Sequence, residues 1–425
     1  MTGAGPSRLA ARVPGPHESG EPLRLEVDLA SRWTGSSVMA ASDESFGDKE
    51  NLLKPGPAVF DPGHYGNRGE IVDGWETKRR REPGNDWALV RLGTPGIVTS
   101  IDVDSSYFTG NYPEFCLVEA CGVAGYPSPA ELLDASTEWL EIVPRSRLRG
   151  DAHNTFPVSS PHRFTHVRLS TFPDGGLARL RVNGRIVPDP RQFDGVTIDL
   201  ANQEHGGAVV ATSDGFYTSA SMLNRPDWAR TMGEGWETRR RRDDGHDHVI
   251  VRLAAAGRIR QLIVDTAHYK YNASAAVEVY AAAGDLAPSV DSSAWRTLLP
   301  RTRLQPDTRH VFAVEPDEPG EPVEWVRLDA FPDGGLSRLR VLGDVAPAAR
   351  AEAAFRWFNS LPARQARAEL ESIGLVGPDA EAVIEARPVD ADRLGDVAGG
   401  LAADPLARLH ALLIGPSAAE RGARS

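Results

Sequence analysis

The sequence predicts two tandem all-β modules followed by a small helical appendage. Three observations support this: a long internal repeat, alternation of apolar and polar residues within it, and a change to Ala-, Arg- and Glu-rich sequence after Gly343. The chain has 425 residues, enough for two or three domains with cores of their own. No apolar run approaches the ~20 residues that a membrane span needs.

The repeat is visible in motifs that recur at a nearly constant offset. GWETKRRR at 74–81 returns 161 residues later as GWETRRRR at 235–242. VRLSTFPDGGLARLRV at 167–182 returns as VRLDAFPDGGLSRLRV at 326–341, with 13 of 16 positions identical. A period this long indicates a duplicated domain and not a solenoid. The expected organisation is a disordered lead at 1–21, a first module at 22–190, a second module at 191–345, and a helical appendage with a tail at 346–425.

Each module reads as a set of antiparallel strands. Apolar and polar residues alternate over 88–92, 100–104, 164–172 and 177–187. An Asn-Gly pair at 183–184 predicts a turn. Pro173-Asp174-Gly175-Gly176 predicts another, because Pro fixes φ and Gly permits positive φ. Many short strands and few helices favour a β-sandwich or jelly roll.

The appendage has helical spacing. Its apolar residues Phe355, Phe358 and Leu361 recur at i, i+3 and i+6. The other helix signals are Pro362 for a first turn, Gly374 for an end, a helix that ends before Pro388 and another over 404–414. These signals indicate packing, and we expect no catalytic role for this part.

Two cysteines, Cys116 and Cys121, lie five residues apart in a predicted strand. An odd separation points their side chains to opposite faces, so we expect two buried thiols and no disulfide. Together with an N-terminus that lacks a signal-peptide pattern, this predicts a cytoplasmic protein. The net charge of −12 gives no general attraction to nucleic acid or to anionic membranes.

The recurring residues that neither core nor turns explain are mostly charged. In the first module they are Glu76, Arg79, Arg80, Arg81, Asp86, Arg91, Asp104, Asn111, Asp174, Arg179 and Arg181. In the second they are Glu237, Arg240, Arg241, Arg242, Asp247, Arg252, Asp265, Asn272, Asp333, Arg338 and Arg340. The arginine run is open to three interpretations: a solvated strand, a nucleic-acid patch or an anion site. Guanidinium groups placed side by side need carboxylate neighbours or an anionic ligand.

Compact motifs for metal or nucleotide binding are missing from the sequence. No HxH, HExxH or CxxC spacing occurs, which argues against a dedicated zinc site near His248 and His268. Mg²⁺ or Mn²⁺ held by Asp and Glu oxygens needs no compact motif, so a divalent cation stays open with its ligands unknown. No other cofactor is indicated, because P-loop, Rossmann and Gly-x-Ser-x-Gly patterns do not appear.

The two GWET-[KR]-RRR motifs, each followed by G-x-D-x-x-x-x-R-L, resemble the allantoicase family. So do SDESFG at 42–47, the segments that end in Asn111 and Asn272, and the two FPDGG motifs. The resemblance covers roughly residues 22–345 and implies tandem jelly-roll modules similar to galactose-binding-like domains. It further implies hydrolysis of allantoate to ureidoglycolate and urea in purine (allantoin) degradation.

The chemistry of allantoate fits the recurring residues. Its carboxylate needs a bidentate cation, and its two ureido arms need hydrogen-bond donors and acceptors. Cleaving a C–N bond needs an acid for the leaving urea and a base for water, which two carboxylates with separated pKa values, or a metal, can supply. The candidate catalytic residues are Glu76, Asp86 and Asp174. The candidate substrate-binding residues are Trp75, Arg79, Arg81, Asn111, Arg179, Arg181, Glu237, Arg240, Asn272, Asp333 and Arg338.

Among these, Arg179, just past the Pro-Asp-Gly-Gly turn and expected at the rim of a cleft, is the first candidate for the carboxylate ligand, and Arg79 is the second. The alternative is that Arg179 pairs with Asp174 or Asp104 and only pins the turn. The first module keeps the Phe-x-Gly-Asn pattern at 108–111, whereas Tyr269-Lys270-Tyr271-Asn272 has lost the glycine, so we expect catalysis mainly in the first module. The expected partner is allantoate, with no nucleic acid and no membrane, in a homo-oligomer. A non-catalytic tandem β-sandwich that binds carbohydrate or another small molecule is the alternative, and a degenerate regulatory relative is a third class.

Overall fold

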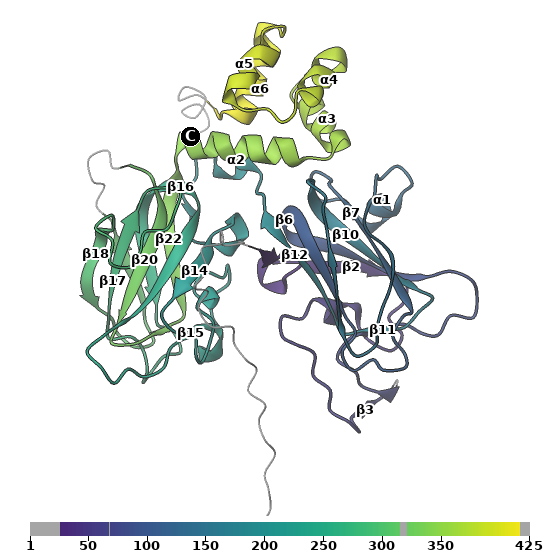
Figure 1. Cartoon of the computed structure of the whole chain (residues 1–425), viewed down its shortest axis with the longest axis horizontal. Coiled ribbons are helices and arrows are strands. Elements are labelled where there is room, and N and C mark those ends of the chain that lie inside the picture. The colour runs from purple at the N-terminus through teal and green to yellow at the C-terminus, as the bar shows by residue number, and fades with distance from the viewer. Residues whose placement is uncertain (1–25, 68, 315–320, 417–425) are drawn as a thin grey trace, which may run out of the picture.

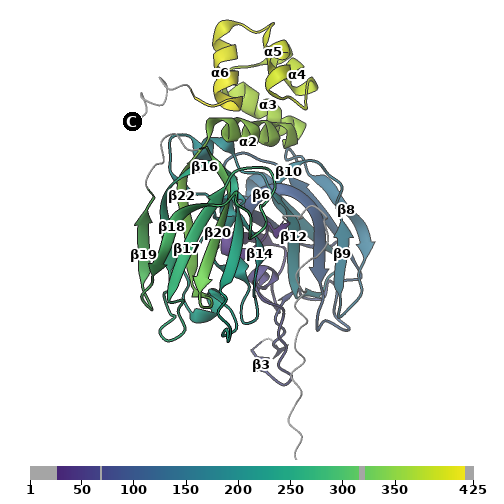
Figure 2. The same cartoon turned by 60° about the vertical axis from the view of Figure 1, so that its left-hand side comes forward.

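A computed structural model describes residues 26–67, 69–314 and 321–416 of the chain. Two β-sandwich modules lie side by side, and C-terminal helices cross one end of the pair (Figure 1). The second view shows the same arrangement, with the helices at one end and β3 (Tyr65–Gly66) at the other (Figure 2). The lead predicted at 1–21 lies outside the described residues, as does the end of the tail, residues 417–425.

The first module is built on one long strand, β6 (Asp86–Asp104), which joins both halves of the sandwich. Its first half pairs with β2 and β10, and its second half pairs with β9 and β12. The strands predicted at 88–92 and 100–104 are therefore two parts of one strand. A Cβ at Gly96 would lie 2.3 Å from the carbonyl oxygen of Arg185, so only glycine fits where the strand passes between layers. The other elements are β1 (Val27–Asp28), β2 (Ser37–Ala41), β4 (Gly69–Glu70), β5 (Trp75–Glu76), β7 (Phe115–Cys121), α1 (Pro129–Leu133), β8 (Leu140–Arg147), β9 (His153–Pro157), β10 (Arg163–Phe172), β11 (Gly176–Leu177) and β12 (Arg179–Ile186).

The second module repeats this topology strand for strand. The main sheet of the first module has the strand order β1-β12-β6-β10-β7-β8, and β2 and β9 also pair with β6. The main sheet of the second module has the strand order β13-β22-β16-β20-β17-β18, and β14 and β19 also pair with β16. The predicted duplication of an antiparallel sandwich is confirmed at the level of strand order. The elements are β13 (Ile198–Asp199), β14 (Ala208–Thr212), β15 (Trp236–Glu237), β16 (Asp247–Asp265), β17 (Ala276–Ala282), β18 (Arg296–Arg303), β19 (Arg309–Ala313), β20 (Val323–Phe331), β21 (Gly335–Leu336) and β22 (Arg338–Val345).

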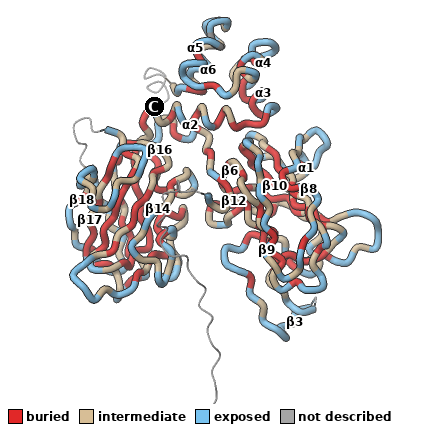
Figure 3. The backbone as a smooth tube through the Cα atoms, in the orientation of Figure 1, coloured by how far each residue is buried: buried red, intermediate tan, exposed pale blue. Residues whose placement is uncertain are grey.

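Each module has its own hydrophobic core between its layers, and the loops at the sandwich ends are exposed (Figure 3). Trp75 and Trp236 stand at matching places and are fully buried. Each indole Nε1 donates a hydrogen bond of 2.8 Å to a loop carbonyl, that of Asp43 or Asp214. The paired GWET motifs therefore begin with a core anchor that ties the next loop to the sandwich.

The turn predicted at Asn183-Gly184 is wrong. Strand β12 runs through both residues and pairs with β6, with a register shift between them that marks a bulge. A Cβ at Gly184 would lie 2.3 Å from the carbonyl oxygen of Ile97. The glycine is thus explained by close approach of two backbones. At the turn predicted for 173–176, the chain bends at Pro173 and passes through Asp174 and Gly175, at φ +141°, into β11 at Gly176.

The helices form a separate core that packs on the linker between the modules. They are α2 (Pro347–Ser360), α3 (Ala363–Ser372), α4 (Gly377–Glu385), α5 (Ala391–Ala398) and α6 (Ala403–Leu413). The predicted helix ends near Gly374 and before Pro388 are confirmed, as is the last helix, whereas α5 was not predicted. Two ion pairs join the helices to the linker. Arg350 Nε of α2 lies 2.9 Å from Asp194 Oδ1, and Glu369 Oε2 of α3 lies 3.0 Å from Arg191 Nη1. Among the described residues, no helix is both long enough and apolar enough to cross a membrane.

Both cysteines are free and buried, as the sequence predicted. Cys116 belongs to the main core of the first module, and Cys121 packs with Leu89 on the opposite face of β7. Burial raises the pKa of each thiol to about 12, so both stay protonated at neutral pH.

Candidate active site

Loops that are distant in sequence meet at the end of each sandwich that lies away from the helices (Figure 1). In the first module, Glu76 pairs with Gly176 between β5 and β11 and bridges to Gly47. Strand β6 begins at Asp86, opposite Thr171 near the end of β10. Two of the predicted catalytic carboxylates, Glu76 and Asp86, therefore lie at the same end of the module.

Glu76 is a half-buried carboxyl group with one defined partner. Its Oε1 accepts a 2.7 Å hydrogen bond from Asn111 Nδ2. Burial raises the pKa of Glu76, and the hydrogen bond from Asn111 opposes this in part. Trp75, which precedes it, is fully buried in the core, so the predicted contact of Trp75 with substrate is replaced by an anchoring role.

Asp86 is buried beneath the arginine run. Its Oδ1 accepts hydrogen bonds from Arg80 Nη1 at 2.7 Å and from Ser42 Oγ at 3.0 Å. Its Oδ2 is buried and has no hydrogen-bond partner among the described residues. Asp86 is thus the inner partner of Arg80, with a second oxygen left for a ligand or a water molecule.

The arginine run is a loop and not a strand beyond Glu76. Asp174 Oδ2 accepts a 2.8 Å hydrogen bond from the backbone N–H of Arg80, and Asp43 Oδ1 accepts one of 2.9 Å from that of Lys78. These carboxylates pull the chain out of the strand path after β5. The predicted common face of Trp75, Arg79 and Arg81 is therefore wrong: the tryptophan is in the core, and both arginines are exposed.

The second module reproduces these contacts. Asn272 Nδ2 donates to Glu237 Oε1 at 2.7 Å, and Asp333 Oδ2 accepts the backbone N–H of Arg241 at 3.0 Å. Arg241 Nη1 donates to Asp247 Oδ1 at 3.0 Å, and Asp247 Oδ2 is again buried without a partner among the described residues. Predicted Arg240 is exposed, like its counterpart Arg79.

Comparison with known proteins identifies this architecture. The model of the allantoicase repeat matches residues 27–187 and again 198–346. The chain belongs to the allantoicase family. The resemblance predicted from the GWET and FPDGG motifs is confirmed, and both motifs lie at the shared loop end of their modules.

Named relatives align with about three quarters of this chain. A protein of Streptomyces coelicolor named "Probable allantoicase" is 45% identical over 76% of this chain and 87% of its own length. One of Nocardia farcinica with the same name is 48% identical over 75% of this chain and 94% of its own. The crystal structure of allantoicase from Saccharomyces cerevisiae is 30% identical, with a TM-score of 0.63 over 75% of this chain and 93% of that chain.

Three of the predicted arginines, Arg179, Arg181 and Arg338, hold loops of their own modules, and Arg179 and Arg338 are buried. Arg179 is 3% exposed, and its guanidinium donates to the carbonyls of Gly56 at 3.0 Å and Asp73 at 2.8 Å and to Asp73 Oδ2 at 2.5 Å. Arg181 donates to the carbonyl of Lys54 at 2.5 Å. They tie down both ends of the 54–73 loop, so Arg179 lies inside the module and not at the rim of a cleft.

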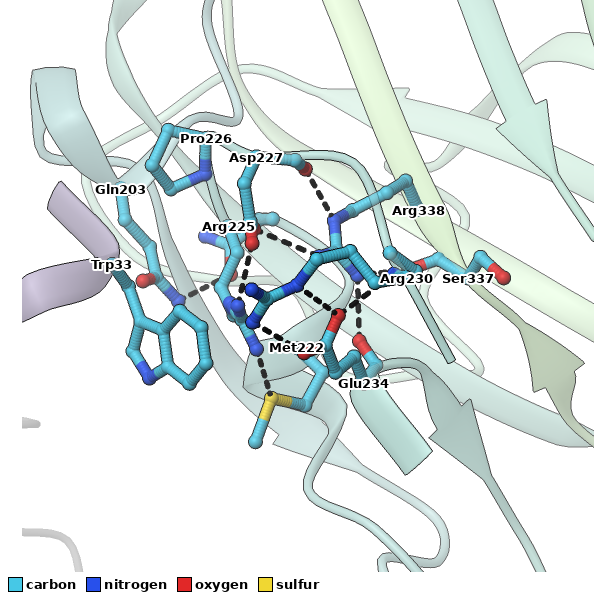
Figure 4. Close-up of polar contacts among 12 residues, drawn as sticks. Trp33, Gln203, Met222, Arg225, Pro226, Asp227, Arg230, Glu234, Ser337 and Arg338 are labelled. Atoms are coloured by element: carbon cyan, nitrogen blue, oxygen red, sulfur yellow. Dashed lines mark hydrogen bonds and ion pairs between the residues drawn. The ribbon is translucent and has the colours of Figure 1, made fainter. Parts of the chain in front are cut away.

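The same clamp closes the 225–234 loop of the second module (Figure 4). Arg338 donates to Asp227 Oδ1 at 2.8 Å and, through Nη1, to the carbonyl of Glu234 at 2.6 Å. Arg225 donates to Asp227 Oδ2 at 2.7 Å, and its guanidinium lies 3.3 Å from the ring centre of Trp33 of the first module. This cation–π contact joins the two modules.

Sequence reasoning did not select Arg80 as a site residue. Strand periodicity assigned Arg79 and Arg81 to the candidate face, and that periodicity does not apply to a loop. The usable signal was the Ser42-Asp43 pair, which recurs as Ser213-Asp214. Ser42 donates to Asp86, and Asp43 accepts the backbone N–H of Lys78, so the pair orients the arginine run.

The described residues, 26–67, 69–314 and 321–416, also contain cavities. Cavities of about 490 and 400 Å³ lie elsewhere, the first between the linker, Arg258 and Arg350, and the second beside Tyr126. Within those ranges, no cluster of three or more His, Cys, Asp or Glu side chains is arranged to hold a metal ion. The candidate active site is therefore built from loop side chains at the sandwich end.

Proposed function

We propose that this protein hydrolyses allantoate to ureidoglycolate and urea. The observation that carries the proposal is family membership over both repeats, with relatives named "Probable allantoicase" at 42–48% identity. The loop end of the first module adds the chemistry: a half-buried carboxyl group, an amide and guanidinium groups within one set of loops.

Substrate binding needs a charge complement for one carboxylate and polar contacts for two ureido arms. Guanidinium groups of the arginine run supply the first, because a planar fork matches a carboxylate. Asn111 and Glu76 supply a donor and an acceptor suited to a ureido group. The exposed Arg79 and Arg81 are proposed contacts of the substrate.

We propose Glu76 as the general acid. Its raised pKa favours the protonated form, which can deliver a proton to the nitrogen of the leaving urea as the C–N bond breaks. A hydroxyl from water replaces the ureido group on the central carbon and completes ureidoglycolate. Asp174, which accepts the backbone N–H of Arg80, is our proposed general base for the attacking water. Asp86 accepts a hydrogen bond from the Arg80 guanidinium and so positions it.

We further propose that the protein works in the cytoplasm, in keeping with its two unpaired buried thiols, and as a homo-oligomer. Val59, Tyr65 and Ile71 on the 54–73 loop are 67%, 69% and 49% exposed. Apolar side chains grouped on a projecting loop suit a contact between copies. Sedimentation velocity at several concentrations tests this.

The activity is tested by urea release from allantoate by purified protein. Assays with Mn²⁺, with Mg²⁺ and after chelator treatment show whether a divalent cation is needed. One urea and one ureidoglycolate per allantoate is the expected stoichiometry. Lack of urea under all these conditions, with sugar binding in its place, would support the carbohydrate-binding alternative.

A further inference from the structure

One contact breaks the symmetry between the two modules, and it involves Arg80 and its counterpart Arg241. Both arginines donate Nη1 to a buried aspartate, and the backbone N–H of each donates to the aspartate side chain of the Pro-Asp-Gly-Gly segment. Their side chains are 29% and 27% exposed. The inner edges of the two guanidinium groups are therefore equivalent.

The outer edges differ. Arg241 donates Nε to Asp243 Oδ1 at 2.9 Å and Nη2 to Asp243 Oδ2 at 3.0 Å, which is a bidentate carboxylate pair. The hydrogen bond to Asp243 is also the largest cause of the raised pKa of Arg241. In the first module, Arg80 Nε is buried and has no hydrogen-bond partner among the described residues. Glu82 stands where Asp243 stands in the second module, and it is exposed.

A glycine lies against the guanidinium group in both modules. A Cβ at Gly84 would lie 2.7 Å from Arg80 Nη2, and one at Gly245 would lie 2.6 Å from Arg241 Nη2. Each guanidinium thus rests against a glycine, with no side chain in between. Asp243 shows that a carboxylate fits on this edge, and among the described residues none is hydrogen-bonded to the corresponding Nε of Arg80.

We propose that Arg80 binds the substrate carboxylate in the first module, and that Asp243 occupies the equivalent edge of Arg241 and closes the second module to carboxylate ligands. This rests on the proposed function for the identity of the ligand, a small carboxylate with a ureido arm. Glu76 ends β5 and Arg80 lies in the loop that follows it. Gly176 pairs with Glu76, and Asp174 accepts the backbone N–H of Arg80, so both residues are held by one short segment at the same end of the module.

A tethered carboxylate makes an effective block. Asp243 is two residues from Arg241, so its local concentration exceeds that of a free ligand, although its side chain is 66% exposed. The second module then keeps the Glu237–Asn272 pair but lacks a free carboxylate receptor. One chain has one functional site as a result, even though its fold is duplicated.

Equilibrium binding of N-carbamoylglycine, a carboxylate with one ureido arm, tests this without relying on turnover. Calorimetry of the full chain should give one equivalent bound, and the amide of the same probe, which has no charge, should bind at least tenfold more weakly. Arg80→Lys should weaken binding at least tenfold, because an ammonium group cannot form the fork. Arg241→Lys is the matched control and should leave the affinity unchanged.

Exchange of the residue at the blocking position gives the reverse test. Asp243→Asn should raise the stoichiometry from one to two, and adding Arg241→Lys should return it to one. Glu82→Asp should weaken binding in the first module, while Glu82→Gln should not.

Normal binding by Arg80→Lys, or a single equivalent with Asp243→Asn, would overturn the proposal. If Arg80→Lys does not fold, the stoichiometry of Asp243→Asn decides. Urea release measured separately shows whether a failure concerns this assignment or the hydrolytic activity.

Discussion

Arg179 and Asp73 form a buried pair, with 2.5 Å between Nη2 and Oδ2, at the base of the 54–73 loop. The carbonyl oxygens of Gly56 and Asp73 accept further hydrogen bonds from the same guanidinium group. Arg338 and Asp227 repeat the pair in the second module at 2.8 Å. A recurring arginine in a FPDGG-L-x-R-L-R-V motif therefore holds a loop, and its hydrogen bonds leave little capacity for a ligand.

We predict that Arg179→Lys destabilises the fold by roughly 2–3 kcal/mol, because hydrogen bonds to a buried charge are lost. The kinetics of the protein that remains folded should stay near normal. Urea-induced unfolding and allantoate kinetics measure the two effects, and Arg181→Lys, at a partly exposed position, should cost less. A tenfold fall in kcat/KM with an unchanged melt would instead make Arg179 a ligand.

Glu76→Gln should lower kcat by about 10²-fold or more, since it removes the proposed general acid while keeping the side-chain volume. Glu237→Gln should have a smaller effect, because we place catalysis mainly in the first module. Steady-state urea release by both variants, each checked for folding by circular dichroism, makes the comparison. A larger loss with Glu237→Gln would reverse the assignment of the modules.

The pH dependence should identify Glu76. As the acid, Glu76 must be protonated, so kcat/KM should fall as the pH rises through its raised pKa. The hydrogen bond from Asn111 lowers that pKa, so Asn111→Ala should move the alkaline limb to higher pH. Asn272→Ala should leave the limb in place, and a limb that does not move with Asn111→Ala would assign it to another group.

The same raised pKa has a consequence for stability. Because folding favours protonated Glu76, the stability this group contributes is present at low pH and is lost as the pH rises through the folded-state pKa. Glu76→Gln should therefore be more stable than the wild type at neutral pH, and this advantage should disappear on acidification. Thermal melts across the acid range measure it, and an advantage that is constant with pH would show that burial of this carboxylate has no cost.

Removal of the helices after Val345 should leave kcat within a few-fold. The helices pack on the linker at Asp194 and Arg191, at the end of the modules away from the candidate site (Figure 1). Truncation exposes the apolar surface that they cover, so aggregation is the expected cost. Size-exclusion chromatography separates folded from aggregated protein before the assay, and inactivity of the folded fraction would show that the helices support the site.

The sequence by itself determined the duplication, the β-sandwich class, the helical end and the family, because these depend on periodicity and on long recurring motifs. It also determined the state of Cys116 and Cys121, since alternation along a strand fixes the faces of two residues. Only the tertiary structure showed which arginines are buried and hold loops and which are exposed. Arg179 is buried because a loop 106 residues earlier supplies Asp73, and Arg80 turns inward because Asp174 captures its backbone N–H. Such long-range partners leave no local pattern, so the sequence did not distinguish the arginines that hold loops from those that are exposed or from the proposed carboxylate receptor Arg80.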